Sequence, residues 1–236
     1  MNAPTPSLSL IIASMNRSLQ TLELVRSVMP FLSAHDRFIL VDYNDPERIR
    51  DKAHEPGNPK LVIITVPRVT VFHHTHARNC GLRECRTDLC VFADTDFYIP
   101  GEALDEIRAM QPSEFLTQPD KVRSIGFVAS TTEAALAVCG WEEAFTGYGW
   151  DDCEYRMRLA QIPLRNRVMA HSLWPMVGTA NVRTYESPRL DLSASTNAKI
   201  VRVLRGLRQP HSNHNRNWGL GYEVLVNPDA TAGQPA

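Results

Sequence analysis

The sequence predicts an α/β fold in which a mostly parallel sheet is flanked by helices. In the first hundred residues, short apolar runs of strand length alternate with segments whose apolar residues recur at helical spacing. Three of the apolar runs, at residues 7 to 13, 37 to 42 and 89 to 94, lead into polar or acidic loops. In open parallel sheets such loops meet at the carboxyl edge of the strands, where ligands bind.

The elements of the first half follow in order. Strands are expected at residues 7 to 13, 37 to 42, 61 to 66 and 89 to 94. The first helix should begin at Ser18 as its N-cap, with an inward face made by Leu19, Leu22, Val25, Val28 and Leu32. A second helix is expected at residues 77 to 87, with Leu82 and Cys85 inward.

The second half is less regular. Strands are expected at residues 124 to 130, 134 to 140 and 165 to 170, and helices at residues 151 to 161 and 195 to 207. The last helix should bury Ile200, Val203, Leu204 and Leu207. Because no repeat or clear linker interrupts the chain, residues 1–236 are interpreted as one domain, with a flexible tail at 227–236.

Composition excludes several classes of protein. The chain has 236 residues, is 43% hydrophobic and carries a formal net charge of -1, which gives no global indication of a nucleic-acid partner. The five cysteines include no CxxC pair, so they are expected to be buried or half-buried thiols. Neither a signal peptide nor an apolar stretch of membrane-spanning length is evident, so a cytoplasmic protein is expected.

Two carboxylates stand where the strand at 89 to 94 ends. Asp94 and Asp96 are followed at once by bulky apolar residues. Paired carboxylates suit a hard cation such as Mn²⁺ or Mg²⁺, whose shell a diphosphate completes. In a solvent loop the same pattern is usually a turn or a cap, but its place after a buried strand favours a metal site.

A second acidic pair opens the helix at 151 to 161. Asp151 and Asp152 follow the Gly-rich aromatic stretch GWEEAFTGYGW, and helix capping alone would account for acids at a helix N-terminus. Trp150 stands directly before the pair, where an aromatic ring can stack on a sugar.

Five segments together resemble the GT-A glycosyltransferases, close to family 2 and to the galactosyltransferase C-terminal type. They are SLIIASMNR, FILVDYND, HARNCGL, VFADTDFYIP and GWEEAFTGYGWDDCEYRMRL, in the family's order over about residues 7 to 175. The resemblance implies a Rossmann-like nucleotide-diphospho-sugar transferase fold. It also implies a nucleotide-binding half at 7–100 and an acceptor-binding half at 101–220.

The resemblance also implies roles for individual residues. Asp94 and Asp96 match the DXD motif, with Asp96 the more direct metal ligand and Thr95 beside the donor. Asp152 matches the general base of inverting members, and Asp151 stands where an acceptor-positioning Glu is usual. Donor-binding roles are implied for Ser14, Asn16, Arg17, Asp42, Arg78 and Asn79, with Asp42 reading the nucleotide base.

A third metal ligand is implied in many such enzymes, often a histidine. His171 is the candidate, with His211 and His214 as rivals. Residues 73 to 76, HHTH, would place His74 and His76 on one face if extended, but no acid lies nearby in sequence. A buried structural role is the alternative for His171.

The function predicted is a metal-dependent hexosyltransferase of polysaccharide biosynthesis, which moves a sugar from a UDP-sugar to a glycan or other hydroxyl acceptor. Inversion is inferred from Asp152 alone. A nucleotidyltransferase is one alternative, although SMNRS lacks the Gly-rich phosphate loop of that class. A non-catalytic sugar-nucleotide-binding domain is another. Helix 195–207, which carries Lys199, Arg202 and Arg205 with Arg208 just after it, is either a solvated face or a peripheral membrane contact.

Overall fold

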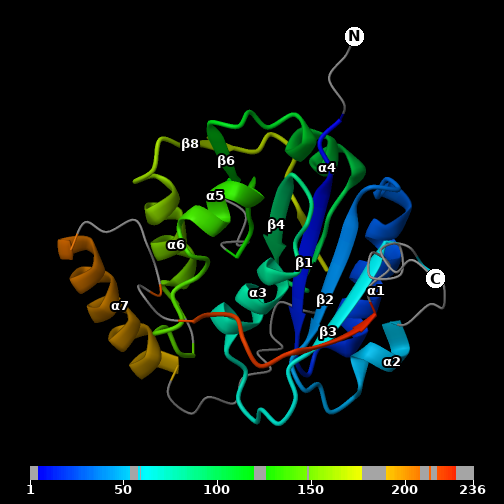
Figure 1. Ribbon diagram of the computed structural model, residues 1–236, viewed down its shortest axis with the longest axis horizontal. Coiled ribbons are helices and arrows are strands. Elements are labelled where there is room, and N and C mark those ends of the chain that lie inside the picture. The colour runs from blue at the N-terminus through cyan, green and yellow to red at the C-terminus, as the bar shows by residue number, and fades with distance from the viewer. Residues whose placement is uncertain are drawn as a thin grey trace, which may run out of the picture.

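An eight-stranded sheet runs through the molecule in the order β10-β3-β2-β1-β4-β7-β6-β8 (Figure 1). The structure is a computed structural model, and it describes residues 5–53, 58, 60–119, 126–147, 149–176, 190–207, 213 and 217–226. Neighbouring strands are parallel except where β7 and β10 take part. The predicted α/β fold with a mostly parallel sheet is therefore confirmed.

Four parallel strands make the part of the sheet that positions the site. They are β1 (Leu8–Ser14), β2 (Arg37–Asp42), β3 (Leu61–Thr65) and β4 (Leu89–Ala93). Successive side chains point to opposite faces, so Leu10 and Ile12 lie in one apolar cluster and Ile11 lies in the other. Because both faces are covered, these strands are apolar throughout instead of alternating, which is why the sequence revealed them.

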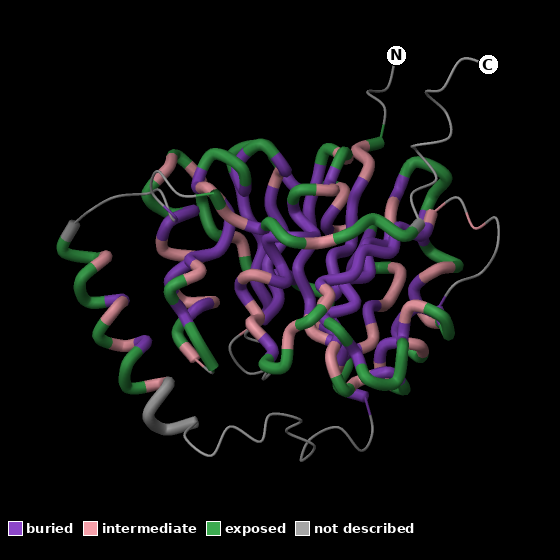
Figure 2. The backbone as a smooth tube through the Cα atoms, turned by 60° about the horizontal axis from the view of Figure 1, so that its bottom comes forward, coloured by how far each residue is buried: buried purple, intermediate pink, exposed green. Residues whose placement is uncertain are grey.

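Helices cover both faces of the sheet. On one face lie α1 (Ser18–Val28) and α4 (Gly101–Arg108), and on the other lie α3 (His74–Arg83), α5 (Thr132–Ala137) and α6 (Asp151–Leu159). The short helix α2 (Ile49–Ala53) follows β2, and a 3-10 turn (Met29–Phe31) follows α1. Helix α7 (Leu190–Leu207) lies beyond α6 at one end of the molecule in both views (Figures 1 and 2).

Shorter strands complete the sheet. Strands β6 (Glu114–Thr117), β7 (Val128–Thr131) and β8 (Arg165–Val168) extend it beyond β4, and β10 (Glu223–Val226) pairs with β3 at the other edge. Strands β5 (Phe97–Tyr98) and β9 (Trp174–Pro175) form a separate antiparallel pair. Because β4 pairs with β7, one sheet runs through both of the predicted halves.

One segment predicted as a strand is helical, and one that was considered only as if extended is helical too. Residues 134 to 140, predicted as a strand, begin inside α5, where the Thr131 side chain accepts a hydrogen bond of 3.1 Å from the backbone of Ala134 and caps the helix. The Ala-rich run that follows has high helix propensity, which the apolar pattern hid. Residues 73 to 76 are also not extended, because α3 begins at His74.

The predicted inward faces of two helices were partly wrong. Leu19 on α1 is 75% exposed, while Leu24 is buried with Val25 and Val28. On α7, Val203 is exposed, whereas Asn197 and Val201 are buried. Arg17, not Ser18, is the N-cap of α1, and the Ser18 hydroxyl instead donates a hydrogen bond to Asp45.

Several smaller expectations can be compared directly. Cys80, Cys85 and Cys90 are buried thiols, and Cys139 and Cys153 are half-buried, as predicted. In the described part of the chain, no helix combines the length and apolarity that crossing a membrane requires. Lys199, Arg202 and Arg205 are exposed on α7, while Arg208 and the predicted tail at 227–236 lie outside the described residues.

Candidate active site

The carboxyl ends of the central strands lead into the predicted site. Strand order reverses at β1, because β2 and β3 lie on one side of it and β4 lies on the other. Such a switch point leaves a crevice outside the strand ends. Ser14 ends β1 and Asp42 ends β2, while Asp94 follows β4 directly. Three of the predicted site residues therefore lie at the carboxyl edge of the sheet.

Arg78 joins the two acidic pairs. Its guanidinium donates hydrogen bonds to Asp94 Oδ1 at 2.8 Å and to Asp152 Oδ1 at 2.9 Å, and also to the carbonyl of Gly126 at 2.8 Å. The side chain is only 1% exposed. Residues that are far apart in sequence, from β4 and from α6, are thus held together by one buried cation.

The arginine is supported by stacked aromatic rings. Its guanidinium carbon lies 4.2 Å from the ring centroid of Trp141, and the rings of Trp141 and Tyr155 stack at 4.2 Å. Arg158 lies over the other side of Tyr155 at 5.3 Å. Such cation–π and stacking contacts help to hold the Arg78 guanidinium in position.

His74 connects the same two acidic pairs one helical turn before Arg78. Its ring nitrogens lie 3.3 Å from Asp94 Oδ1 and 3.3 Å from Asp151 Oδ2. Burial and the charge of Arg78 would lower the pKa of His74, but the two carboxylates outweigh them and raise it to about 9. The imidazole is therefore positively charged at neutral pH.

The carboxylates in contact with Arg78 and His74 have different pKa values. Burial would raise the pKa of Asp94 and of Asp151, but Arg78 and His74 hold both below the ordinary value. Burial together with the negative charge of Asp151 raises the pKa of Asp152 to about 6, although Arg78 opposes the shift. Among Asp94, Asp151 and Asp152, it is thus Asp152 whose protonation changes nearest neutral pH.

Asp96 faces a different cation. Arg17 donates to Asp96 Oδ1 at 3.0 Å from the loop after β1. Asn16, just before it, has a left-handed backbone with φ 57°, which turns the chain sharply there. Burial raises the pKa of Asp96 despite Arg17. The predicted first loop and the predicted DXD motif are therefore in direct contact.

A strained turn presents the second acidic pair. Trp150, the N-cap of α6, has φ 75°, a left-handed conformation that is uncommon for a bulky residue. Asn197 of α7 donates hydrogen bonds to the carbonyls of Thr146 at 3.1 Å and Gly149 at 2.9 Å. The turn is thereby fixed, and Trp150 is left half in solvent beside Asp151.

Three predicted donor-site residues have other partners. Asp42 is buried and accepts hydrogen bonds from the Asp45 backbone and from Arg50, at 2.7 and 2.8 Å. The side-chain amide of Asn79 accepts a hydrogen bond from the backbone N–H of Trp141 and donates to the Trp141 carbonyl and to the Glu143 carboxylate. The Ser14 hydroxyl accepts a hydrogen bond from Thr21. Asp94, Asp151 and Asp152 around Arg78 and His74 form what we call the carboxylate cluster. None of the contacts of Asp42, Asn79 and Ser14 named above reaches this cluster.

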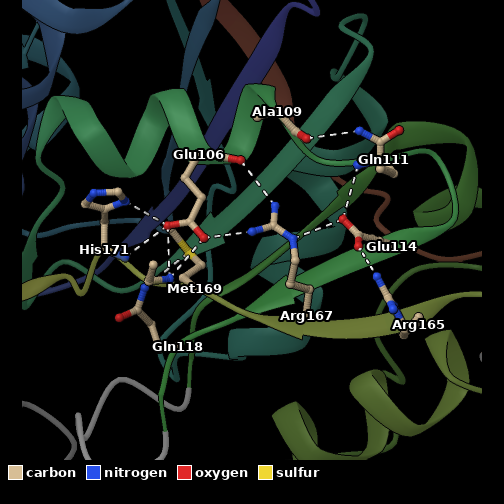
Figure 3. Close-up of polar contacts among 10 residues, drawn as sticks. Glu106, Ala109, Gln111, Glu114, Gln118, Arg165, Arg167, Met169 and His171 are labelled. Carbon is tan, nitrogen blue, oxygen red and sulfur yellow. Dashed lines mark hydrogen bonds and ion pairs between the residues drawn. The ribbon is translucent and has the colours of Figure 1, made fainter.

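His171 lies in another network. Its ring contacts Glu106 at 3.0 Å, and Glu106 also pairs with Arg167 (Figure 3). Arg167 continues to Glu114, which binds Arg165. The contacts of His171 thus lead to α4 and β8, away from Asp94 and Asp96. His211 and His214 lie outside the described residues.

The carboxylates of Asp94 and Asp96 suit a divalent cation. Oxygen ligands are those that Mn²⁺ and Mg²⁺ prefer. A side chain at Gly126 would meet Asp94 Oδ2 at 2.1 Å, so the missing Cβ makes room for this carboxylate. Among the described residues, no three His, Cys, Asp or Glu side chains are grouped to hold a metal ion. The residues therefore fit a cation whose shell is completed by phosphate and water.

Two members of the cluster had no role predicted from the sequence: His74 as a partner of the acids, and Gly126. His74 was weighed only in an extended segment. In a helix, His74 and Arg78 are four residues apart on one face, and that spacing is the signal that could have found them. Nothing in the sequence near Gly126 indicated its contact with Asp94.

One protein-family model matches the first part of the chain. Residues 9–110 match the family model described as "Glycosyl transferase family 2". A comparison with curated proteins found no match.

Three solved structures share the fold. A mannosyltransferase from Pyrobaculum calidifontis, in complex with GDP-Man and Mn²⁺, has TM-score 0.59 and 15% identity, over 70% of this chain and 55% of its own. The catalytic domain of Drosophila beta1,4galactosyltransferase 7, complexed with xylobiose, has TM-score 0.54 and 12% identity, over 72% and 71%. S. aureus TarS 1-349 has TM-score 0.58 and 14% identity, over 71% and 59%. The chain thus spans little more than half the length of the first and third.

Proposed function

We propose that this chain, of which residues 9–110 match the family model of glycosyl transferase family 2, moves a sugar from a nucleotide-diphosphate sugar to an acceptor hydroxyl with inversion at the anomeric carbon. The observation that carries the proposal is the single cluster in which Arg78 joins Asp94 of the DXD motif to Asp152 of α6. This arrangement supports a proposal in which Asp94 and Asp96 serve the donor and Asp151 and Asp152 serve the acceptor.

The donor side would use Asp94, Asp96 and the loop after β1. These two carboxylates would hold Mn²⁺ or Mg²⁺ between them and the diphosphate, and the ion would neutralise charge on the leaving group. Arg17 lies at the same carboxylate and offers a cation to a phosphate that approaches it. A solved Pyrobaculum neighbour carries GDP-Man with Mn²⁺, and a solved TarS neighbour carries UDP.

The acceptor side would use α6. Asp152 takes the proton from the attacking hydroxyl. Its raised pKa makes it a stronger base than an ordinary carboxylate, and because that pKa, about 6, is still below 7, the side chain is mainly ionised at neutral pH. His74 keeps Asp151 charged, so Asp151 can accept a second hydrogen bond from the acceptor. Trp150, exposed beside the pair, would stack on the acceptor sugar.

The nucleotide base is a separate part of the proposal. UDP is favoured because a carboxylate at Asp42 can accept the imide N–H of uracil. In the structure both Asp42 oxygens already accept hydrogen bonds, one from the Asp45 backbone and one from Arg50, which also supports a role in holding the loop after β2. Guanine offers a similar N–H, so the two roles are separated by the binding of UDP and of bare diphosphate, each with Mn²⁺, to Asp42→Ala. Only a base reader makes UDP lose far more affinity than diphosphate does.

Turnover of nucleotide sugars tests the proposed function. Purified protein is incubated with a panel of UDP- and GDP-sugars, with Mn²⁺ or with EDTA, and release of the nucleotide diphosphate is measured. We expect EDTA-sensitive release that is retained in Glu133→Gln, an exposed change on α5. Donor binding without any such release would support a non-catalytic binding domain instead. Release of pyrophosphate from a nucleoside triphosphate and a sugar phosphate would support a nucleotidyltransferase.

A further inference from the structure

A groove outside the carboxylate cluster lies between α1, α4 and the β5–β9 pair. Its volume is about 640 Å³, and its lining includes Ser27, Phe31, Tyr98, Glu102, Asp105 and Trp174. Of the nine described residues that line it, three are aromatic and two are acidic, and none is basic. We call this feature the aromatic groove.

The rings of the aromatic groove are placed by backbone pairing. Tyr98 and Trp174 are direct partners in the antiparallel β5–β9 pair, so their side chains project from the same face, side by side. The Tyr98 hydroxyl donates a hydrogen bond to Glu23 of α1, which fixes the ring. Trp174 is 63% exposed, although a ring of this size is usually buried on a protein without a ligand there.

Phe31, in the 3-10 turn after α1, lines the same groove as this pair. It is 50% exposed, and its ring lies so close to Gly101 that a Cβ there would meet Phe31 Cδ1 at 2.8 Å. The absence of a side chain at Gly101 therefore leaves the ring lying against the start of α4. Two exposed rings, Phe31 and Trp174, and the half-buried ring of Tyr98 thus line one groove.

The charges at the rim select a class of ligand. Asp105 is paired with Arg108 at 2.9 Å, so part of the negative charge of the lining is already compensated. An anionic ligand would be repelled by Glu102 and Asp105. Sugar hydroxyls can donate to carboxylates, while the C–H faces of a sugar ring pack against aromatic faces. A neutral carbohydrate satisfies both parts of the lining.

The backbone links one wall of the aromatic groove to the candidate active site. Tyr98 follows Asp96 by two residues, and the backbone N–H of Met176, two residues after Trp174, donates to the Asp96 carbonyl at 2.8 Å. The β5–β9 pair thus joins the DXD motif to the groove. A carbohydrate chain that contacted Tyr98 and Trp174 would therefore lie against the segment that follows Asp96.

We propose that the aromatic groove binds a neutral carbohydrate chain, at sugars remote from the one that receives the transferred sugar. The inference rests on the proposed function, because it makes this chain the acceptor. It assigns Trp174, Tyr98 and Phe31 to acceptor affinity and not to the chemical step.

Oligosaccharide binding in the absence of donor and metal tests the inference. The probes are neutral tetrasaccharides of glucose, galactose, mannose and N-acetylglucosamine, the amine-bearing tetramer of glucosamine, and an anionic uronic-acid tetrasaccharide, each titrated by calorimetry. We expect a neutral probe to bind best. Trp174→Ala and Phe31→Ala should each weaken its binding about tenfold, the loss expected for a missing aromatic contact. Leu136→Ala, which removes an exposed apolar side chain on α5, should change nothing.

The outcomes separate this inference from the proposed function. Binding of UDP with Mn²⁺ should be the same in Trp174→Ala and in the unaltered protein. If nucleotide sugars are turned over but no neutral probe binds, or if the two groove variants bind it normally, the groove assignment is wrong and the function stands. Preferred binding of the amine-bearing or the anionic tetramer also overturns it. If probes bind through Trp174 but no nucleotide sugar is bound or turned over, the proposed function is wrong and the groove is a carbohydrate site.

Discussion

Asp152 is the residue whose titration should be visible in the rate. Its pKa is raised to about 6 by burial and by the neighbouring charge of Asp151. A general base must be unprotonated, so kcat/KM should be constant above this value and fall about tenfold per pH unit below it. The measurement is kcat/KM against pH from 5 to 8, with the donor dissociation constant as control. A flat profile over this range would contradict the assignment.

Gly126 is the residue that makes room for Asp94. A Cβ there would lie 2.1 Å from Asp94 Oδ2, so Gly126→Ala must displace the carboxylate. We expect the affinity for UDP with Mn²⁺ to fall about tenfold or more, because a charge-assisted contact worth about 1.5–3 kcal/mol is disturbed. Gly206→Ala on α7 is the matched control, since nothing lies within 4 Å of its added Cβ. Equal donor affinity in both variants would show that Asp94 does not hold the donor.

At the scale of elements, the turn before α6 depends on α7. Asn197 is buried and bonds the carbonyls of Thr146 and Gly149. Asn197→Ala leaves these carbonyls without that donor, which should lower the free energy of unfolding by about 1–3 kcal/mol. Turnover should also fall, because Trp150 and the acid pair follow this turn. Thr196→Ala, an exposed neighbour on the same helix, should leave both quantities unchanged, as measured by urea unfolding and steady-state kinetics.

Sequence reasoning succeeded where local pattern and global fold agree. The strands β1 to β4 were visible because they are buried on both faces, and α6 was visible through its acids and its apolar spacing. It failed at α5, because a short apolar run is compatible with a strand as well as with a helix, and here a Thr131 cap decides. It also failed for Leu19, because helical spacing fits more than one face of α1.

The site was predictable in its residue types and less so in its contacts. Asp94, Asp96, Asp151 and Asp152 were identified, and the structure brings Asp94, Asp151 and Asp152 around His74 and Arg78. The partners could not be read from the chain, because Arg78 reaches Asp152 across 74 residues and depends on the stack at Trp141. Asn79, adjacent to Arg78, instead bonds Trp141 because it lies on another face of α3.

At the scale of the whole molecule, Asp36 ties three elements together. It accepts hydrogen bonds from the Leu8 backbone, the Ser33 backbone and Arg108 of α4, and its side chain is fully buried. Burial would raise the pKa of Asp36, but these donors lower it. Its stabilisation is therefore present above pH 3.8, the unfolded value, and is lost as the pH falls through the lower folded value.

Removing Asp36 should destabilise the fold without touching the site. Asp36→Ala leaves Arg108 without its buried partner, which should lower the free energy of unfolding by about 3–5 kcal/mol. Asp105→Ala removes the other partner of Arg108, but that side chain is 78% exposed, so about 0–1 kcal/mol is expected. Urea unfolding at pH 7 measures both. Similar losses for the two variants would show that burial of the pair does not matter.

Asp94 and Asp96 are assigned to donor binding, and Asp152 is assigned to the chemical step. Measuring donor affinity together with turnover tests these separate roles most directly. The dissociation constant for a UDP- or GDP-sugar with Mn²⁺ and the kcat for its turnover are determined for Asp96→Ala and Asp152→Asn. We predict that Asp96→Ala weakens donor binding strongly, because a charged ligand is lost. Asp152→Asn should keep the donor dissociation constant within a few-fold and lower kcat by about 10²-fold or more. Unchanged Mn²⁺-dependent donor binding in Asp96→Ala, or near-normal turnover in Asp152→Asn, would contradict the account.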